Sequence, residues 1–376
     1  MLEKLELVNF RNLKNNTLTL KSGLNVFYGN NAQGKTNLLE AVYLLSSGKS
    51  FRAETDKELI SWGHQEAKIA GTAPPLQIEL EIKEGGKKLR VNRQAKRLIE
   101  LIGEFLVVLF APEDLLIVTG PPNLRRGWLN SFISKIDKNY LFNLAKFTKL
   151  LKIRNSLLAQ KALGRGLELG VWNKQLVELG ILLWFSRRDY LGKINEQLKT
   201  LSPKLGAELI YLDSITQIKL TDQREAREDF EKKLAALERE EIRRAQSLIG
   251  PHRDDFKIIF EQKLDGKIVS KDVGIYGSRG EQRAAVLSLK LAETEIIEDS
   301  KGKKPTLLLD DVLSEFDREH REMIQKLLYR QQSLVTTTSL GFLEKKLLAK
   351  ANIFYVERGA CKAVVTAQGG GKGLSV

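Results

Sequence analysis

The sequence predicts an α/β fold that is split by an all-helical insertion, and three observations lead to this prediction. A short apolar run over residues 24–28 meets a glycine-containing loop, and a helical pattern follows over residues 35–46. A second apolar run, over residues 306–309, ends in two aspartates. Between these points apolar residues recur at helical spacing. We therefore expect an α/β domain formed by residues 1–112 and 250–376 and a helical lobe formed by residues 113–249.

The amino-terminal part contains further strand patterns. Residues 2–8 alternate apolar and charged side chains, which is typical of a half-buried strand. Residues 76–82 and 87–91 flank a pair of glycines and predict a β-hairpin. Residues 105–110 predict another strand, which Pro112 ends.

The central part is predicted to contain two long helices that form a hairpin and a third, charge-rich helix over residues 224–248. Trp172, Leu176, Leu179 and Leu183 follow one another at helical spacing, and Gly164-Arg165-Gly166 predicts the turn before them. After residue 250 the strand patterns return. The expected elements are a hairpin over residues 256–260 and 267–273 around Asp265-Gly266, helices over residues 279–298 and 317–330, a strand over residues 333–336, and a disordered glycine-rich tail over residues 369–373.

The composition bounds the class of protein. The chain has 376 residues, 42% of them hydrophobic, which suffices for two globular parts. Its formal net charge of +14 suits a nucleic-acid partner, although solubility alone also explains it. The start lacks a signal-peptide pattern, and no apolar run approaches the roughly 20 residues that span a bilayer. A single cysteine and three histidines exclude an internal disulfide and a standard zinc cage, and favour a reducing compartment.

The loop after the first buried strand fits the pattern G-x-x-x-x-G-K-[ST] at every position. A strand before it and a helix after it give the context of an ATP-binding P-loop, in which backbone N–H groups surround phosphate oxygens. Lys35 is expected to reach the β- and γ-phosphates, and Thr36 to hold Mg²⁺. The expected ATP-binding residues are Gly29, Asn30, Asn31, Ala32, Gln33, Gly34, Lys35 and Thr36.

Asp310 and Asp311, at the end of the second apolar run, supply the acids that a P-loop needs. We expect Asp310 to join the Mg²⁺ shell and Asp311, together with Lys35, to act in catalysis by orienting or deprotonating water. Because the P-loop and these acids lie at opposite ends of the chain, the ATPase domain must be interrupted by the helical lobe. The chain also lacks the Asn-Lys-x-Asp motif of GTPases.

The segment Ser278, Arg279, Gly280, Glu281 and Gln282 opens a predicted helix before the aspartate strand. In this order it resembles the signature motif of ABC-type ATPases. The resemblance implies that the motif acts in trans, on ATP held by the P-loop of a second copy. A helix N-terminus with a serine hydroxyl and free amides is a site for anions. The alternative is an ordinary capped helix. The same resemblance assigns Ser314 and Asp317 to the D-loop and Thr337 to the switch position, where a histidine is usual.

Several blocks narrow the resemblance: Asn9-Phe10-Arg11-Asn12, Gly48-Lys49-Ser50-Phe51-Arg52, Ala111-Pro112-Glu113-Asp114-Leu115, Arg125-Arg126 and Gly250-Pro251-His252-Arg253-Asp254-Asp255. With the signature they resemble the RecF family of SMC-like DNA-repair ATPases over nearly the whole chain. The resemblance implies that Arg11 contacts ATP and that the protein is cytoplasmic and nucleoid-associated. It further implies binding to duplex DNA and single-strand junctions and ATP-dependent dimerisation. With RecO and RecR such a protein helps RecA to load, and acts in replication-fork maintenance and the SOS response.

Four basic residues inside these blocks are candidates for DNA contact: Arg52, Arg125, Arg126 and Arg253. Each is equally compatible with an internal ion pair or an ATP contact. Because Asp311 is shorter than the usual catalytic glutamate, we expect weak, DNA-stimulated ATP hydrolysis that serves a binding switch. The alternative function is the nucleotide-binding subunit of an ABC transporter, which the aspartate, the threonine and the basic charge disfavour. A long-armed chromosome protein ranks last because the insertion is short.

Overall fold

The structure is a computed structural model, and it describes residues 1–165, 168–201, 207–212, 222–264 and 267–364. The chain divides into two compact units, Met1–Pro112 with Gly302–Val376, and Glu113–Lys301. The first boundary agrees with the expected position, whereas the second lies at residue 301 and not at residue 249. Gly166, the Asp265-Gly266 turn and the 369–373 tail, which carried predictions, lie outside the described residues. No helix among the described residues is long and apolar enough to cross a membrane.

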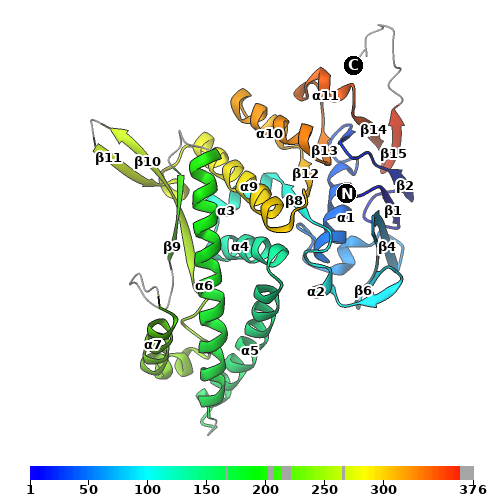
Figure 1. Ribbon diagram of the computed structural model, residues 1–376. Coiled ribbons are helices and arrows are strands. Elements are labelled where there is room, and N and C mark those ends of the chain that lie inside the picture. The colour runs from blue at the N-terminus through cyan, green and yellow to red at the C-terminus, as the bar shows by residue number, and fades with distance from the viewer. Residues whose placement is uncertain (166–167, 202–206, 213–221, 265–266, 365–376) are drawn as a thin grey trace. The chain divides into compact units, whose positions relative to one another are not determined.

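The first unit contains two six-stranded sheets (Figure 1). One is antiparallel, with order β2-β1-β4-β5-β6-β7, and the other has order β15-β14-β3-β13-β12-β8 and is parallel except at β15. The strands are β1 (Lys4–Val8), β2 (Asn16–Thr19), β3 (Leu24–Tyr28), β4 (Glu66–Ala73), β5 (Leu76–Lys83), β6 (Gly86–Val91), β7 (Gln94–Lys96), β8 (Val107–Phe110), β12 (Thr306–Asp310), β13 (Ser333–Thr337), β14 (Asn352–Glu357) and β15 (Ala360–Val364). The helices are α1 (Lys35–Ser47), α2 (Leu98–Leu101), α10 (Arg318–Arg330) and α11 (Lys345–Leu348), with 3-10 turns at Asp56–Leu59, Val312–Ser314 and Leu340–Phe342.

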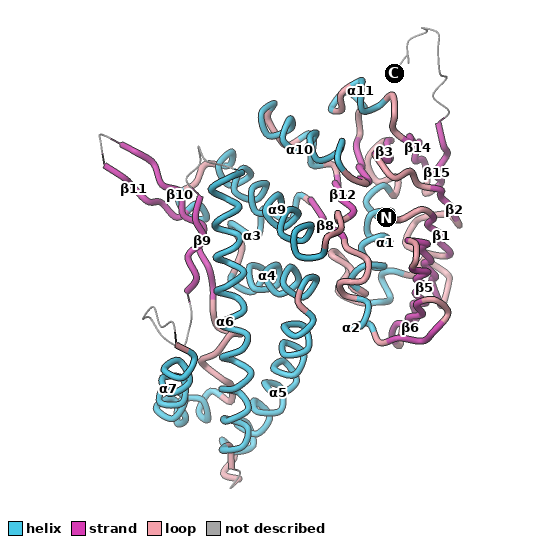
Figure 2. The backbone as a smooth tube through the Cα atoms, in the orientation of Figure 1, coloured by secondary structure: helices cyan, strands magenta, loops and turns pink. Residues whose placement is uncertain are grey.

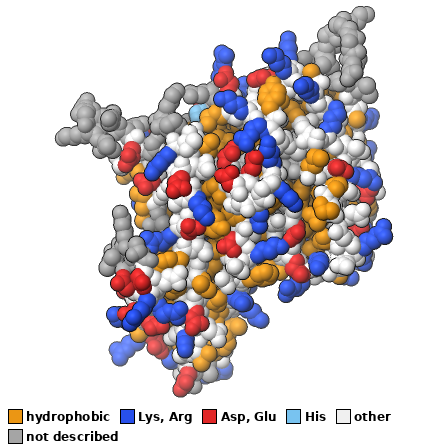
Figure 3. All heavy atoms as spheres, in the orientation of Figure 1, with side chains coloured by type: hydrophobic (Ala, Val, Ile, Leu, Met, Phe, Trp, Pro, Cys, Tyr) orange, Lys and Arg blue, Asp and Glu red, His pale blue; other side chains and the backbone are white. Residues whose placement is uncertain are grey.

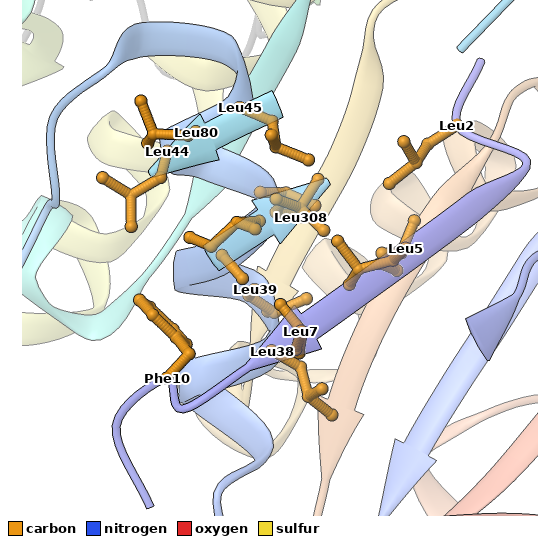
Figure 4. Close-up of a cluster of buried hydrophobic side chains, with 14 of the residues drawn as sticks. Leu2, Leu5, Leu7, Phe10, Leu38, Leu39, Leu44, Leu45, Leu80 and Leu308 are labelled. Atoms are coloured by element: carbon orange, nitrogen blue, oxygen red, sulfur yellow. The ribbon is translucent and has the colours of Figure 1, made fainter. Parts of the chain in front are cut away.

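The helix α1 lies between the two sheets of the first unit and contacts strands of both. Leu38, Leu39, Leu44 and Leu45 of this helix are fully buried, in one cluster with side chains of both sheets. Figure 4 shows them beside Leu5 and Leu7 of β1 and Leu308 of β12. Complete burial of one such leucine stabilises the fold by about 1.5–3 kcal/mol. The core therefore fixes the position of α1, at whose first turn the predicted P-loop ends.

The parallel strand order brings distant segments of the chain together. β13 pairs with β3 on one side, with Val335 opposite Val26, and with β12 on the other, with Val335 opposite Leu309. Because parallel strands end at the same edge of a sheet, the loops after β3, β12 and β13 meet there. This edge carries the P-loop and the paired aspartates.

The second unit is mainly helical but also contains a small antiparallel sheet (Figure 2). Its helices are α3 (Leu116–Thr119), α4 (Pro122–Ile136), α5 (Lys138–Ala162), α6 (Gly170–Leu201), α7 (Gln223–Arg244), α8 (Val273–Tyr276) and α9 (Arg279–Lys301). The sheet has order β11-β10-β9, from β9 (Ala207–Leu212), β10 (Asp255–Leu264) and β11 (Lys267–Asp272). The expected helical hairpin is confirmed by α5 packing on α6.

The sheet explains why the second boundary differs from the expected position. β9 lies within the lobe expected to be all-helical, and it pairs with β10 from Asp255 opposite Leu212 to Phe260 opposite Ala207. Helix α9 packs on α6 and α4. These contacts place residues 250–301, including the signature segment, in the second unit.

Candidate nucleotide-binding site

The P-loop has the backbone that phosphate binding requires. Gly34 adopts φ 105°, and a Cβ on it would lie 2.7 Å from the Leu13 side chain, so only glycine fits this position. Helix α1 begins at the next residue, and no side chain caps its first turn. The N–H groups of this turn have no partner inside the helix and carry its positive dipole end. They therefore form an anion site.

Lys35 lies folded over this loop. Its Nζ donates hydrogen bonds to the carbonyl oxygens of Gly29, at 2.7 Å, and Asn30, at 2.8 Å. Burial lowers the pKa of the Lys35 ammonium, and the nearby carboxylates of Asp311 and Asp310 oppose that shift. The side chain is thus positioned as a cation at the loop.

Asp310 meets the P-loop helix directly. The hydroxyl of Thr36 donates to Asp310 Oδ1 at 2.8 Å, and the hydroxyl of Thr336 donates to the same oxygen at 2.7 Å. A hydroxyl and a carboxylate oxygen are hard donors of the kind that Mg²⁺ prefers. The two residues that the sequence nominated as magnesium ligands are therefore in contact, although 274 positions separate them.

Asp311 has a different environment from its neighbour. Its backbone is left-handed, with φ 52°, and its N–H donates to the hydroxyl of Thr336 at 3.0 Å. Its Oδ1 is buried and accepts no hydrogen bond from the residues that the structure describes. Burial raises the pKa of this carboxyl, while the charge of Lys35 and a backbone hydrogen bond from Thr338 lower it. A carboxylate with a raised pKa and an unused oxygen suits a general base.

These residues line a pocket of about 310 Å³. A cavity of about 900 Å³ lies elsewhere in the first unit, around Trp62, but its described lining includes the ion pairs Lys57–Glu84 and Lys83–Glu66 and no part of the P-loop. Chemistry, rather than size, identifies the smaller pocket as the candidate site. Its walls are Asn12, Asn31, Ala32, Gly34, Lys35, Thr36, Asn37, Arg52, Asp310 and Asp311. Sequence reasoning did not nominate Asn12 and Asn37, although they adjoin Arg11 and Thr36.

Arg52 lies in the wall of this pocket, although the sequence nominated it as a DNA contact. Its backbone N–H donates to the hydroxyl of Ser50 at 2.8 Å, and that hydroxyl in turn donates to Glu40 of α1. The loop that carries Arg52 is thus held to the P-loop helix. The position favours a contact with phosphate of the nucleotide.

Arg11, by contrast, is not among the described residues that line the pocket. Its guanidinium forms a bidentate ion pair with the fully buried Glu40, at 2.8 and 2.7 Å. A bidentate pair fixes a side chain firmly. The structure therefore gives Arg11 a role in holding its loop against α1, and Glu40, which the sequence did not single out, joins both loops.

The signature segment begins α9 in the second unit. Ser278 and Glu281 form a capping box: the N–H of Glu281 donates to Ser278 Oγ at 3.3 Å, and the N–H of Ser278 donates to Glu281 Oε2 at 2.8 Å. Lys271 forms an ion pair with Glu281 at 2.6 Å, and Gln282 donates to the Val273 carbonyl. Ser278, Arg279 and Gly280 are exposed. The predicted helix start is confirmed.

The D-loop and switch candidates lie in short local networks. The Ser314 hydroxyl donates to the Asp311 carbonyl at 2.9 Å. Asp317 caps α10 by accepting the N–H of His320 at 3.0 Å. Thr337 is 1% exposed, and its hydroxyl donates to the Ser339 carbonyl at 2.9 Å. Thr337 is therefore bound within its own loop.

The other three candidate DNA contacts belong to the second unit. Arg125 forms a bidentate ion pair with Asp255 at 2.7 and 2.8 Å, which is the internal alternative. Arg126 donates to the Asp254 carbonyl, and burial lowers the pKa of its guanidinium. Arg253 donates to the Ser247 carbonyl and is the exposed one of the three. Basic and acidic side chains are interspersed on the face that Figure 3 shows, so charge there does not single out one DNA surface.

Comparison with known proteins gives consistent results. The RecF/RecN/SMC N terminal domain family matches residues 1–361. "DNA replication and repair protein RecF" of Clostridium acetobutylicum is 38% identical over 95% of this chain and 98% of its own length. The protein of the same name from Macrococcus caseolyticus is 40% identical over the same shares of the two chains.

Solved structures are similar to this chain as well. The chain is similar to "the recombination mediator protein RecF-ATP in RecFOR pathway", with a TM-score of 0.86 and 36% identity, over 97% of this chain and 99% of that one. An Smc head bound to the C-winged helix domain of ScpA is 17% identical over 96% of each chain with a TM-score of 0.52, a likeness of fold alone.

Proposed function

Since the chain belongs to the RecF family of DNA replication and repair proteins, we propose that it is an ATP-dependent DNA-binding protein of recombinational repair whose two copies close on ATP. One observation supports this most strongly. The hydrogen bond between Thr36 and Asp310 joins the P-loop helix to the acidic strand end, as an ATP–Mg²⁺ site requires. The relative solved as RecF-ATP supports the choice of nucleotide.

In this proposal each group of pocket residues has a separate role. The first turn of α1 and Lys35 bind phosphates, and Arg52 adds a second cation. Thr36 and Asp310 would hold Mg²⁺, which neutralises charge on the phosphates when bound. Asp311 orients the water and accepts its proton. Hydrolysis is slow, because the shorter aspartate side chain places the base further from the water, and so ATP serves mainly as a switch.

The signature and D-loop residues complete the site in trans. Ser278, Arg279, Gly280, Glu281 and Gln282 approach the γ-phosphate of ATP in the second copy, while Ser314 and Asp317 lie at the contact between copies. Thr337, buried at the end of β13, occupies the switch position of its own copy. The exposed start of α9 supports this, because it presents the Ser278 hydroxyl and the positive end of the helix to a partner.

The partners follow from the family. We propose that the protein binds duplex DNA and single-strand junctions in the cytoplasm, at the nucleoid, and acts with RecO and RecR to help RecA load. Roles in fork maintenance and the SOS response are part of the same proposal. The names of the relatives favour this function over a transporter subunit. Of the candidate DNA contacts, Arg253 is retained because it is exposed.

Sedimentation with ATP and Mg²⁺, with and without duplex DNA, tests the proposal. Wild type is expected to shift from monomer to dimer. Ser278→Arg is expected to bind ATP with unchanged affinity but to stay monomeric, whereas Lys35→Arg is expected to lose affinity for ATP. A wild type that stays monomeric with ATP contradicts the trans site. Loss of ATP binding by monomeric Ser278→Arg would show that Ser278 acts within its own chain.

A further inference from the structure

Two large apolar side chains are exposed to solvent just before Ser278, the residue that caps α9. Ile275 is 66% exposed and Tyr276 is 72% exposed, and only Gly277 separates them from Ser278. Single exposed apolar residues are common on protein surfaces and by themselves indicate nothing. The position of this pair, next to the proposed trans signature, makes it informative.

The turn that carries the pair is fixed by its other side. Val273 is fully buried, its carbonyl accepts the N–H of Gly277 at 3.0 Å, and Gln282 donates to the same carbonyl at 3.3 Å. A Cβ on Gly274 would lie 2.6 Å from the Val118 carbonyl oxygen, so this part of α8 packs closely on α3. Because one side of the turn is anchored, the side chains of Ile275 and Tyr276 are held outward in a preorganised position.

The P-loop pocket lacks what this pair offers. Its described lining consists of amide, hydroxyl, carboxylate and cationic side chains with one alanine and one glycine, and none of these residues is aromatic. Such groups suit phosphates and a metal ion. A purine base is flat and apolar on its faces and is stabilised by stacking on an aromatic ring. A platform for the base must therefore come from outside this lining.

We infer that Tyr276 stacks on the adenine base of the nucleotide held by the P-loop of a second copy, and that Ile275 packs against that copy beside it. The inference rests on the proposed function, in which Ser278 lies at the γ-phosphate of that nucleotide. Tyr276 is two residues from Ser278, so the two Cα atoms lie within about 7.6 Å. The length of the tyrosine side chain extends this reach along the triphosphate towards the base. The site for the base is thus incomplete in one copy.

Photocrosslinking with 8-azido-ATP and Mg²⁺ locates the base directly. In the dimeric wild-type protein, peptide mass spectrometry is expected to find the label on Ile275 or Tyr276. The label should vanish from this segment in Ser278→Arg, which the proposed function expects to bind nucleotide as a monomer. Labelling confined to residues 1–112 or 302–364 in a sample shown to be dimeric would overturn the inference. A wild type that fails to dimerise would refute the proposed function itself.

A comparison of ATP with ribose 5′-triphosphate shows whether Tyr276 stacks on the base or only contacts the protein surface of the second copy. Tyr276→Ala is expected to raise the ATP concentration for half-maximal dimerisation by roughly 5- to 150-fold per site, the equivalent of the stacking energy of one base. Tyr276→Phe, which keeps the ring, should stay within about twofold of wild type. With ribose 5′-triphosphate, which has no base, Tyr276→Ala should behave as wild type, whether or not wild type dimerises. An equal loss with both nucleotides, or no loss with ATP, would overturn the inference. Tyr329→Ala, at another exposed tyrosine, is the control.

Discussion

Two adjacent carboxylates, Asp310 at the end of β12 and Asp311 after it, have different surroundings. Asp310 accepts two hydroxyl hydrogen bonds, from Thr36 and Thr336, and so stays suited to a metal ion. Asp311 lies in a left-handed turn with one buried oxygen unpaired, and burial raises its pKa. The sequence predicted both roles, but only the fold shows that these neighbours in the chain have different surroundings.

Asp311→Asn is expected to slow ATP hydrolysis by about 10²–10⁴-fold, because the general base is lost, while ATP affinity stays near that of wild type. In wild type, the rate should fall at acid pH in a limb that lies above the ordinary aspartate range, since the pKa is raised. The variant should lack this limb. A pH–rate profile for both proteins measures the effect, and an unchanged limb in Asp311→Asn would assign it to another group.

The raised pKa of Asp311 also determines how its carboxyl changes the stability of the fold as pH rises. A carboxyl whose folded pKa exceeds its unfolded value contributes stability that is present below the unfolded pKa and lost as pH rises through the folded pKa. At neutral pH the buried charge of Asp311 therefore costs stability, and Asp311→Asn should unfold at an equal or higher temperature than wild type. A clearly lower unfolding temperature would contradict this environment for Asp311.

Arg52→Ala tests the reassignment of this residue from DNA to nucleotide. Loss of a charge-assisted contact is expected to weaken ATP binding by about 1.5–3 kcal/mol. Equilibrium binding of ATP to the isolated protein measures it, with Arg253→Ala as a matched control that should leave ATP affinity unchanged. If Arg52→Ala lowers DNA affinity while ATP affinity stays the same, the original assignment to DNA was correct.

At the scale of elements, α9 is held in the second unit by a buried charge cluster. Glu293 is fully buried, accepts hydrogen bonds from Trp128 and Lys135, and also lies beside Lys290. Burial alone raises the pKa of its carboxyl, but the two ammonium groups outweigh burial and lower it to about 2. The cluster joins α9, the helix that Ser278 caps, to α4.

Glu293→Gln is expected to destabilise the protein by about 3–5 kcal/mol, because it removes the buried carboxylate that faces both Lys135 and Lys290, although Lys290 also pairs with Asp114. The exposed Asp299→Asn on the same helix is the control and should change little. As the folded pKa is depressed, the stability from Glu293 is present above the unfolded pKa and lost as pH falls from there towards about 2. Denaturant unfolding at neutral and acid pH checks both statements. A difference between wild type and variant that does not shrink at acid pH would contradict them.

Elements with a strong local pattern were predictable, and their arrangement was not. Residues 24–28 form a strand and residue 35 begins a helix, as expected, because the apolar run and the glycine loop are local signals. The order β15-β14-β3-β13-β12-β8 depends on pairings between distant segments, which no local pattern reveals. β9 was missed although its pairing moves the domain boundary.

The candidate site was likewise predicted only in part. The P-loop and the aspartates were found from motifs, whereas Glu40, the residue that ties Arg11 and Ser50 to α1, was not. Its signal was a single acid inside the apolar run of α1, where a charge requires a buried partner. Arg125 illustrates a choice that the sequence left open: of DNA contact, ATP contact and an internal ion pair, the fold shows the ion pair, with Asp255 of the same chain.

At the scale of the whole molecule, the net charge of +14 leads to a prediction for DNA binding. If the protein recognises the phosphate backbone, the logarithm of its affinity should fall linearly with the logarithm of salt concentration, with a slope of about −0.9 per neutralised phosphate on duplex DNA. Fluorescence anisotropy at several salt concentrations, with ATP present, measures the slope. A flat response would argue against backbone contacts and leave the charge as an aid to solubility.

The central claim is that ATP binds in a site completed by a second copy, and a mixing experiment tests it most directly. Lys35→Ala disables the P-loop, and Ser278→Arg disables the signature. Each variant alone should remain monomeric in sedimentation with ATP and Mg²⁺. In an equal mixture, the intact P-loop of one variant meets the intact signature of the other. Heterodimers should therefore form, each with one of its two ATP sites intact. A mixture that stays as monomeric as its components would contradict the claim.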